Sequence, residues 1–304
     1  MYSAPDLLKK MSNELGLLPG QLEQIINTAP LRYKSFKVPK RSGGERQLAQ
    51  PAREVKAIQR WIISFLLPQL PVHEAATAYK AQASIKKNAE LHRDSNYILK
   101  MDFENFFPSI TGPDLVKHLD RHCHEDLDDS AVKLITRSCV WTPDRRPPLR
   151  LCVGAPSSPL LSNSIMFEFD KILNQYSKHI GAIYSRYADD LTFSTREKHI
   201  LNEFPKKVIS TLKSIPYPSL AINRKKTVFA SRAGRRTITG VTLTPDFRLS
   251  IGRDRKRRIR AMFHRMTLGM LDEFDRQQLE GYIAFGDDIE PGFRDWLNRS
   301  AKQE

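Results

Sequence analysis

The chain has 304 residues, 40% of them hydrophobic, which suffices to bury a sizeable core in one large domain or two to three small ones. Lysine and arginine (49) outnumber aspartate and glutamate (34), and the net charge of +15 favours a polyanionic partner. No apolar run approaches the roughly 20 residues of a membrane span, and the N-terminus lacks a secretory signal. Three cysteines without a CxxC pair fit a reducing compartment, so we expect a cytoplasmic protein with no membrane partner.

In chain order, the first elements are helices and a hairpin. Residues 5–30 predict short helices interrupted at Pro19–Gly20, and residues 33–51 predict two strands with a turn at Gly43–Gly44. Apolar side chains at helical spacing then predict a helix that ends at Pro68. Residues 96–107 begin as a strand in which Asp102 faces away from Leu99 and Met101.

The second half of the chain alternates helices and strands. A helix is expected from Pro113, followed by a polar insertion over 121–150 and one amphipathic helix over 157–180. Residues 182–194 predict a hairpin with a tight turn at Ala188–Asp190. A later pair of strands is joined through Pro245–Asp246, and a basic helix and one further helix complete the chain.

The stretch SRYADDLTFS (185–194) places Asp189 and Asp190 side by side at the hairpin turn. Adjacent carboxylates repel each other unless cations compensate, and Mg²⁺ does so while also binding substrate phosphates. Two such ions about 3.5–4 Å apart require a further carboxylate. Asp102 at the end of its strand is the best candidate, whereas alternation turns the rival Glu104 away. By itself, the pair could equally be a solvated turn.

Three segments in the same order resemble the reverse transcriptases. Tyr187-Ala188-Asp189-Asp190 resembles their catalytic box, DFENFFPSI (102–110) their first aspartate box, and GAPSSPLLSN (154–163) the segment between them. The resemblance covers roughly residues 33–265. It implies an α+β right-hand polymerase with an N-terminal helical segment (1–32), fingers (33–95), a palm with an antiparallel sheet (96–250, with a helical insertion about 113–150) and a small helical thumb (251–304).

Two further elements resemble bacterial retron reverse transcriptases in particular. NAELH (88–92) fits their Asn-Ala-x-x-His element, and Ile238-Thr239-Gly240 stands where they usually carry Val-Thr-Gly. The short chain fits the same group. One departure is Val153, which replaces the glutamine that usually precedes Gly-Ala-Pro and is associated with the incoming nucleotide and the template.

The resemblance also implies roles for individual residues. Asp102, Asp189 and Asp190 are the expected catalytic residues, and they hold two Mg²⁺ ions together with the backbone carbonyl of Phe103. Lys40 and Arg46 are expected to clamp the triphosphate, Phe107 to block a ribose 2′-hydroxyl, and Gly154 to let the backbone approach the nucleotide. The expected nucleic-acid contacts are Asn88, His92, Asn223, Lys225, Lys226, Arg253, Lys256, Arg257 and Arg260.

The implied function is RNA-directed DNA synthesis from deoxynucleoside triphosphates. The enzyme would copy part of a cognate noncoding RNA into a branched RNA–DNA hybrid, msDNA, primed from an RNA 2′-hydroxyl. The family further implies a separately encoded effector protein in an anti-phage system. The alternatives are a ribonucleoprotein scaffold that holds RNA–DNA and an effector, and a group II intron-like reverse transcriptase.

Overall fold

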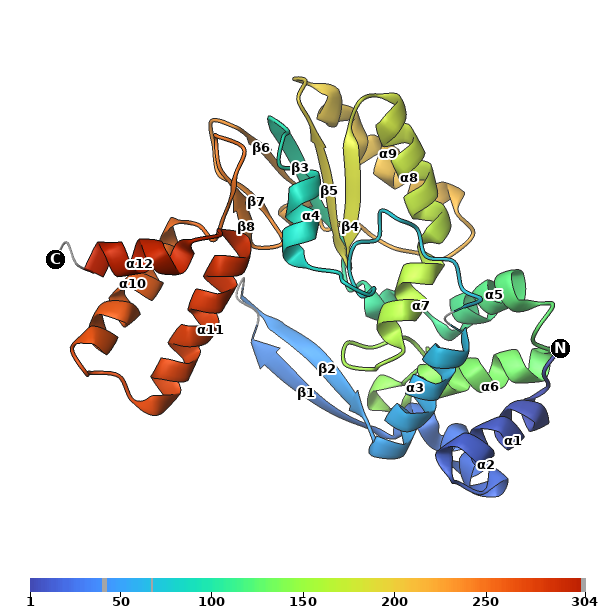
Figure 1. Ribbon diagram of the computed structural model, residues 1–304. Coiled ribbons are helices and arrows are strands. Elements are labelled where there is room, and N and C mark those ends of the chain that lie inside the picture. Colours follow the sequence, from blue (N-terminus) through green and yellow to red (C-terminus); the bar gives the residue numbers. More distant parts are fainter. Residues whose placement is uncertain (40–42, 67, 302–304) are drawn as a thin grey trace.

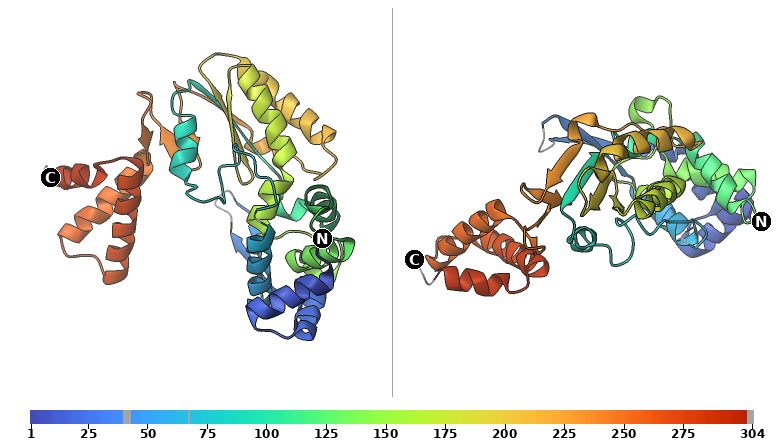
Figure 2. Two further views of the ribbon diagram at one scale, coloured as in Figure 1. Left: turned by 45° about the vertical axis from the view of Figure 1, so that its right-hand side comes forward. Right: turned by 90° about the horizontal axis from the view of Figure 1, so that it is seen from above.

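The computed structural model describes residues 1–39, 43–66 and 68–301. Figure 1 shows a helical N-terminal body, a central sheet with its own helices, and a C-terminal helical unit at the opposite end of the molecule. The two chain termini lie at these opposite ends in all views (Figures 1 and 2). Within the described residues, no helix is both long and apolar enough to cross a membrane.

The α-helices of the described residues fall into the N-terminal body, the central region and the C-terminal helical unit. Their bounds are α1 (Ala4–Leu15), α2 (Pro19–Thr28), α3 (Arg53–Leu66), α4 (Ile85–Leu91), α5 (Gly112–Cys123), α6 (Asp129–Cys139), α7 (Ser158–Ile165), α8 (Phe167–His179), α9 (Phe204–Ser214), α10 (Arg253–Thr267), α11 (Glu273–Ile289) and α12 (Phe293–Ala301). The C-terminal helical unit is α10–α12.

The strands form three antiparallel sheets in the described part of the chain. A hairpin of β1 (Tyr33–Pro39) and β2 (Glu45–Pro51) projects between the N-terminal body and the C-terminal helical unit (Figure 1). The central sheet has the order β4-β5-β3-β6, and a small sheet has the order β7-β8-β9. Their bounds are β3 (Tyr97–Asp102), β4 (Ile183–Tyr187), β5 (Asp190–Thr195), β6 (Val228–Ser231), β7 (Arg236–Ile238), β8 (Val241–Leu243) and β9 (Leu249–Ser250).

Two hydrophobic cores hold these parts together. The larger one joins α1–α3 and α5–α9 to one face of the central sheet, and α8 and α9 cover that face (Figures 1 and 2). The second core joins the small sheet to α10–α12, and it includes Ala89 of α4 and Ile98 of β3. β3 lies between the two cores, because Leu99 and Met101 belong to the larger core and Ile98 belongs to the second.

The structure corrects four details of the predicted elements. The expected helix over 157–180 breaks at Met166 into α7 and α8, and the last part of the chain holds three helices instead of two. The stretch predicted as one strand near 236–243 folds into β7 and β8, because Thr239 and Gly240 adopt positive φ angles of 46° and 83° that suit a tight hairpin turn.

The fourth correction concerns the polar insertion expected over 121–150. Within it, α6 buries Val132, Ile135 and Cys139 on one face, and these side chains belong to the larger core. Their spacing of three and four residues gives the helix an apolar stripe. The segment is therefore part of the N-terminal body, packed against α1, α2 and α3.

Candidate active site

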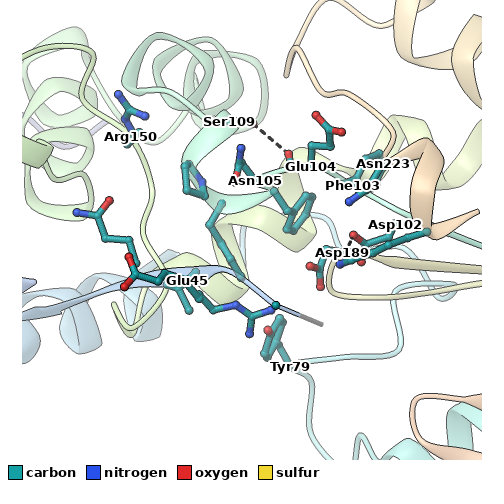
Figure 3. Close-up of a pocket in the computed structure, with 18 residues that line it drawn as sticks. Glu45, Tyr79, Asp102, Phe103, Glu104, Asn105, Ser109, Arg150, Asp189 and Asn223 are labelled. Atoms are coloured by element: carbon teal, nitrogen blue, oxygen red, sulfur yellow. Dashed lines mark hydrogen bonds and ion pairs between the residues drawn. The ribbon is translucent and has the colours of Figure 1, made fainter. Parts of the chain in front are cut away.

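The central sheet brings the three predicted aspartates to one corner. Asp102 is the last residue of β3 and pairs directly with Asp190, the first residue of β5. The Phe103 N–H donates to the carbonyl of Asp189 at 3.1 Å, which fixes the turn against the end of β3. Figure 3 shows the side chains of Asp102 and Asp189 next to each other in the wall of a cavity.

The electrostatics of this corner show an excess of negative charge. Loss of solvent, together with the nearby charges of Asp189 and Asp102, raises the pKa of Asp190 to about 7. Loss of solvent and the charge of Asp102 also raise the pKa of Asp189. Positive charge is supplied by Lys226, whose Nζ lies 2.7 Å from Asp102 Oδ2. This hydrogen bond is the main cause that raises the pKa of Lys226.

We tested whether these residues fit a divalent cation. Over the described ranges, no three acidic, histidine or cysteine side chains converge as metal ligands would. The ammonium of Lys226 donates a hydrogen bond to Asp102 Oδ2. The donors are all oxygens, which Mg²⁺ prefers, and the raised pKa values show that added positive charge would be stabilising. The residues therefore fit Mg²⁺.

Asp102 separates two cavities. The first has a volume of about 730 Å³ and is lined by Asp189, Arg46, Phe107 and Asn223 among others (Figure 3). The second, of about 610 Å³, is lined by Asp190, Tyr187 and Lys225. Lys226 lines both. The three aspartates thus stand where the two cavities meet, with Asp189 on one side and Asp190 on the other.

Several predicted nucleotide contacts lie in or beside the first cavity. Phe107 is 9% exposed, and the charge of Arg46 offsets a small part of the rise in the pKa of Asp189. Asn223 is held in place because its N–H donates to the carbonyl of Asp102 at 2.8 Å. Lys40 lies outside the described residues.

Gly154 has a different constraint from the one predicted. Its φ is +118°, and an added Cβ would lie 2.8 Å from the carbonyl oxygen of Ala49 on β2. The close backbone approach that requires glycine is therefore to the β1–β2 hairpin, where the Ala49 N–H also donates to the carbonyl of Val153. Gly154 lines a neighbouring cavity together with Phe107.

A buried ion pair supports the turn that carries Asp189 and Asp190. Arg186 and Asp170 are both fully buried and form a two-pronged ion pair between β4 and α8, with an Nη2–Oδ2 distance of 2.6 Å. The same guanidinium donates to the carbonyl of Ala188 at 3.1 Å, and Ala188 has a φ of +58° in the turn itself. Asn163 Oδ1 and the Tyr184 hydroxyl complete this network. Sequence reasoning missed it, although an arginine inside a buried strand beside the aspartates was a usable signal.

The structure contradicts direct RNA contacts for Asn88 and His92, because both side chains are fully buried. His92 hydrogen-bonds Ser194 on β5 at 2.7 Å and Ser185 on β4 at 2.8 Å. Asn88 Oδ1 accepts hydrogen bonds from Thr77 and Ser185, both at 2.8 Å. The NAELH element is thus a brace that joins α4 to both strands of the catalytic hairpin.

The basic stretch of α10 is partly used inside the protein. Arg253, Arg257 and Arg260 are exposed, as the prediction of phosphate contacts requires. Lys256 differs, because its Nζ forms an ion pair with Glu290 and lies 5.4 Å from the centre of the Trp296 ring. An acid from outside this stretch thus pairs with it, and Lys256 stabilises the packing of α10–α12.

Comparison with known proteins assigns the family. The family model described as "Reverse transcriptase (RNA-dependent DNA polymerase)" matches residues 38–243. The Retron Ec83 reverse transcriptase of Escherichia coli is 43% identical, with 88% of this chain and 86% of that protein covered. The chain belongs to the retron reverse transcriptases. It is thus an RNA-directed DNA polymerase, and its predicted α+β right-hand polymerase fold is confirmed.

Other relatives of this reverse transcriptase agree. The Retron Ec73 reverse transcriptase of Escherichia coli is 35% identical, covering 91% of this chain and 89% of that protein. Among solved structures, a telomerase from Candida albicans is 15% identical with a TM-score of 0.47, covering 76% of this chain and 49% of that chain. Membership of the reverse transcriptase family makes RNA and DNA the partners of the enzyme.

The buried ion pair yields a stability prediction. Arg186→Leu leaves the Asp170 carboxylate buried without its partner, which should lower the free energy of unfolding by about 3–5 kcal/mol. Arg235→Leu, which breaks an exposed pair with Asp254, should cost less than about 1 kcal/mol. Urea unfolding of both variants measures the difference. Equal losses would show that the buried pair does not anchor the hairpin.

The brace yields a pH prediction. Burial lowers the pKa of His92 from its ordinary value of 6.5 to about 3. Between these two pH values the ring is neutral in the folded protein but protonated in the unfolded chain. Stability from this residue is present above about pH 6.5 and is lost as the pH falls toward 3. The destabilisation caused by His92→Asn should therefore shrink by about 1.4 kcal/mol between about pH 7.5 and about pH 5.5.

Urea unfolding at the two pH values measures this change for His92→Asn. His124 is exposed, so His124→Asn serves as the matched control and should show no such pH-dependent difference. A destabilisation by His92→Asn that stays constant with pH would contradict a neutral, buried His92.

Proposed function

We propose that the enzyme copies part of a cognate structured noncoding RNA into DNA that remains branched from an RNA 2′-hydroxyl, by nucleotidyl transfer assisted by two Mg²⁺ ions. The supporting observation is the meeting of three carboxylates between two cavities, one large enough for a nucleotide and one on the side of Asp190. Membership of the retron family supports the choice of RNA and product.

In this proposal, Asp102 and Asp189 hold the metal ions, and the carbonyl of Phe103 completes one set of ligands. Bound Mg²⁺ would supply activation of the attacking hydroxyl and neutralisation of the departing pyrophosphate. Asp190, which lines the other cavity, lies on the side of the primer end. Lys226 donates to Asp102 Oδ2 and lines both cavities, so it would supply positive charge near the phosphates of a bound nucleotide.

The first cavity is the proposed nucleotide site. Arg46 supplies positive charge near Asp189 for the triphosphate, assisted by Lys40. Phe107 forms the wall against the ribose and Asn223 shapes part of the remaining surface, while Gly154 lines the neighbouring cavity. Lys225 lines the other cavity and is proposed to contact the primer strand.

We propose the following polymerase subdomains from the resemblance to the family. The N-terminal helices (1–32) precede the fingers (33–95), the palm (96–250) carries the central sheet, and α10–α12 form the thumb (251–304). The exposed arginines of α10, Arg253, Arg257 and Arg260, are proposed to contact phosphates of an RNA stem, which are contacts with little sequence information.

Partners beyond nucleic acid rest on family membership alone. We propose a separately encoded effector protein and a role in defence against phage. A cytoplasmic location is proposed because Cys123, Cys139 and Cys152 are buried free thiols, as expected in a reducing compartment.

Catalysis is tested by Asp189→Asn. Removing one carboxylate disrupts metal placement but leaves the basic surface unchanged, so Mg²⁺-dependent primer extension should fall to background while RNA affinity is retained. Glu104→Gln is the matched control, since Glu104 lines the same cavity but belongs to no metal-binding group in the proposal. Wild-type synthesis by Asp189→Asn, or equal loss in both variants, would reject the assigned roles.

Sugar selection is tested by Phe107→Ala. Loss of the aromatic wall should raise ribonucleotide incorporation relative to deoxyribonucleotide by at least about tenfold. Phe106, which is 3% exposed and stacked on Phe103, provides the comparison: Phe106→Ala should lower stability without changing the ratio. Single-nucleotide insertion with the ribonucleotide and the deoxyribonucleotide in competition measures the incorporation ratio of each variant. An unchanged ratio in an active Phe107→Ala enzyme would move the selection to another residue.

A further inference from the structure

Tyr79 lies in the wall between the nucleotide cavity and a neighbouring cavity. It lines the 730 Å³ cavity with Asp189 and also a cavity of about 390 Å³ beneath α3, and Phe107 and Val153 line both as well. The Tyr79 ring centre is 6.4 Å from that of Phe107. The residue is nevertheless 49% exposed, so its ring presents an open face to the cavities and is not core packing. Figure 3 shows Tyr79 at the edge of the nucleotide cavity, across from Glu104.

The segment that carries Tyr79 is attached to the catalytic hairpin. The Arg186 N–H donates to the carbonyl of Ala75 at 2.7 Å, and the Thr77 N–H donates to the carbonyl of Arg186 at 2.8 Å. Asn163 of α7 donates its amide to the carbonyl of Ala78 at 2.8 Å. Three of the four residues before Tyr79 are therefore positioned by hydrogen bonds with β4 and α7.

The backbone of Tyr79 is held in an uncommon conformation. Its φ is +61°, in the left-handed region that bulky residues seldom adopt. Such a conformation persists where the surrounding contacts determine it, and it recurs at functional sites. Here it places a large aromatic ring at the boundary of the two cavities.

The neighbouring cavity has the character of a strand-binding site. Lys56 and Arg60 lie one turn apart on α3, and both line this cavity, whose described lining contains no acidic side chain. The floor is formed by Cys152, Val153 and Gly154 with the following residues. Two cations without a neighbouring acid in the lining suit the phosphates of a nucleic-acid strand that runs past the nucleotide site.

We propose that the ring of Tyr79 packs against the templating RNA base and so positions it opposite the incoming nucleotide. The inference rests on the proposed nucleotide site. With the triphosphate at Arg46 and the sugar at Phe107, the nucleotide base points to the wall of Tyr79 and Val153, and its template partner lies beyond. Val153 has only an aliphatic side chain, whereas an aromatic ring stacks on any base without regard to sequence. Tyr79 is thus a positioning residue that suits copying of arbitrary RNA.

The test compares Tyr79→Asn with Tyr79→Phe in single-nucleotide insertion from an annealed primer. Asparagine tolerates a positive φ and removes the ring, while phenylalanine keeps the ring. Two RNA templates are used, one with a normal templating base and one with an abasic residue at that position. On the normal template, Tyr79→Asn should lower kcat/KM about tenfold, and Tyr79→Phe should stay within about twofold of wild type.

The abasic template isolates the proposed contact. Since it has no base to pack against, wild type and Tyr79→Asn should insert nucleotides there at nearly equal rates. Equal loss on both templates would overturn the proposal, because Tyr79 would then act on the incoming nucleotide or on the local fold. No loss on the normal template would overturn it as well.

Two further measurements separate this inference from the proposed active site. Ribonucleotide discrimination should be unchanged in Tyr79→Asn, unlike Phe107→Ala, and Asp189→Asn should be inactive on both templates. If those two variants behave as expected while Tyr79→Asn does not, the active-site proposal stands and the role of Tyr79 falls. A thermal unfolding midpoint of Tyr79→Asn close to that of wild type is also expected, since the ring is half-exposed.

Discussion

The proposed active site depends on the buried ion pair between Arg186 and Asp170, which lies beneath the turn that carries Asp189 and Asp190. Arg186 pairs with Asp170 in the interior and at the same time holds the carbonyl of Ala188, the residue that precedes the two turn aspartates. A turn that combines a positive φ at Ala188 with two adjacent carboxylates is unfavourable by itself. Because the ion pair is fully buried, replacing either partner alone leaves an uncompensated charge in the core. The geometry of the turn is thereby tied to the stability of the domain.

The NAELH element extends this support to the rest of the site. His92 joins β4 and β5 through two serines, and Asn88 joins β4 to Thr77, two residues before Tyr79. An element typical of retron enzymes therefore acts here through the shape of the active site and not through surface contact with RNA. Ala89 of the same element belongs to the second hydrophobic core, so the element also contacts the core that includes the C-terminal helical unit.

Charge is distributed unevenly for a chain of +15. Three carboxylates meet at one corner with Lys226 as their close partner, which leaves room for added cations, while the exposed arginines of α10 face solvent. Basic side chains that pair internally, such as Lys256 with Glu290, serve packing instead. Net charge thus indicated the class of partner, but burial and local pairing distinguish the cations that remain accessible from those that do not.

Local patterns in the sequence predicted the strand and the hairpin that carry the three aspartates, and the fold class followed from the resemblance to reverse transcriptases. Strand alternation, turn residues and the order of the motifs are short-range properties, and the β3–β5 register then placed Asp102 opposite Asp190. Only the tertiary structure decided the rest. Contacts between segments far apart in the chain bury Asn88 and His92 and bring Gly154 against Ala49. Such contacts also place Tyr79 at the border of two cavities. Burial and hydrogen bonding across such distances have no local pattern in a single sequence, because the neighbour that buries a side chain is chosen by the packing of the whole domain.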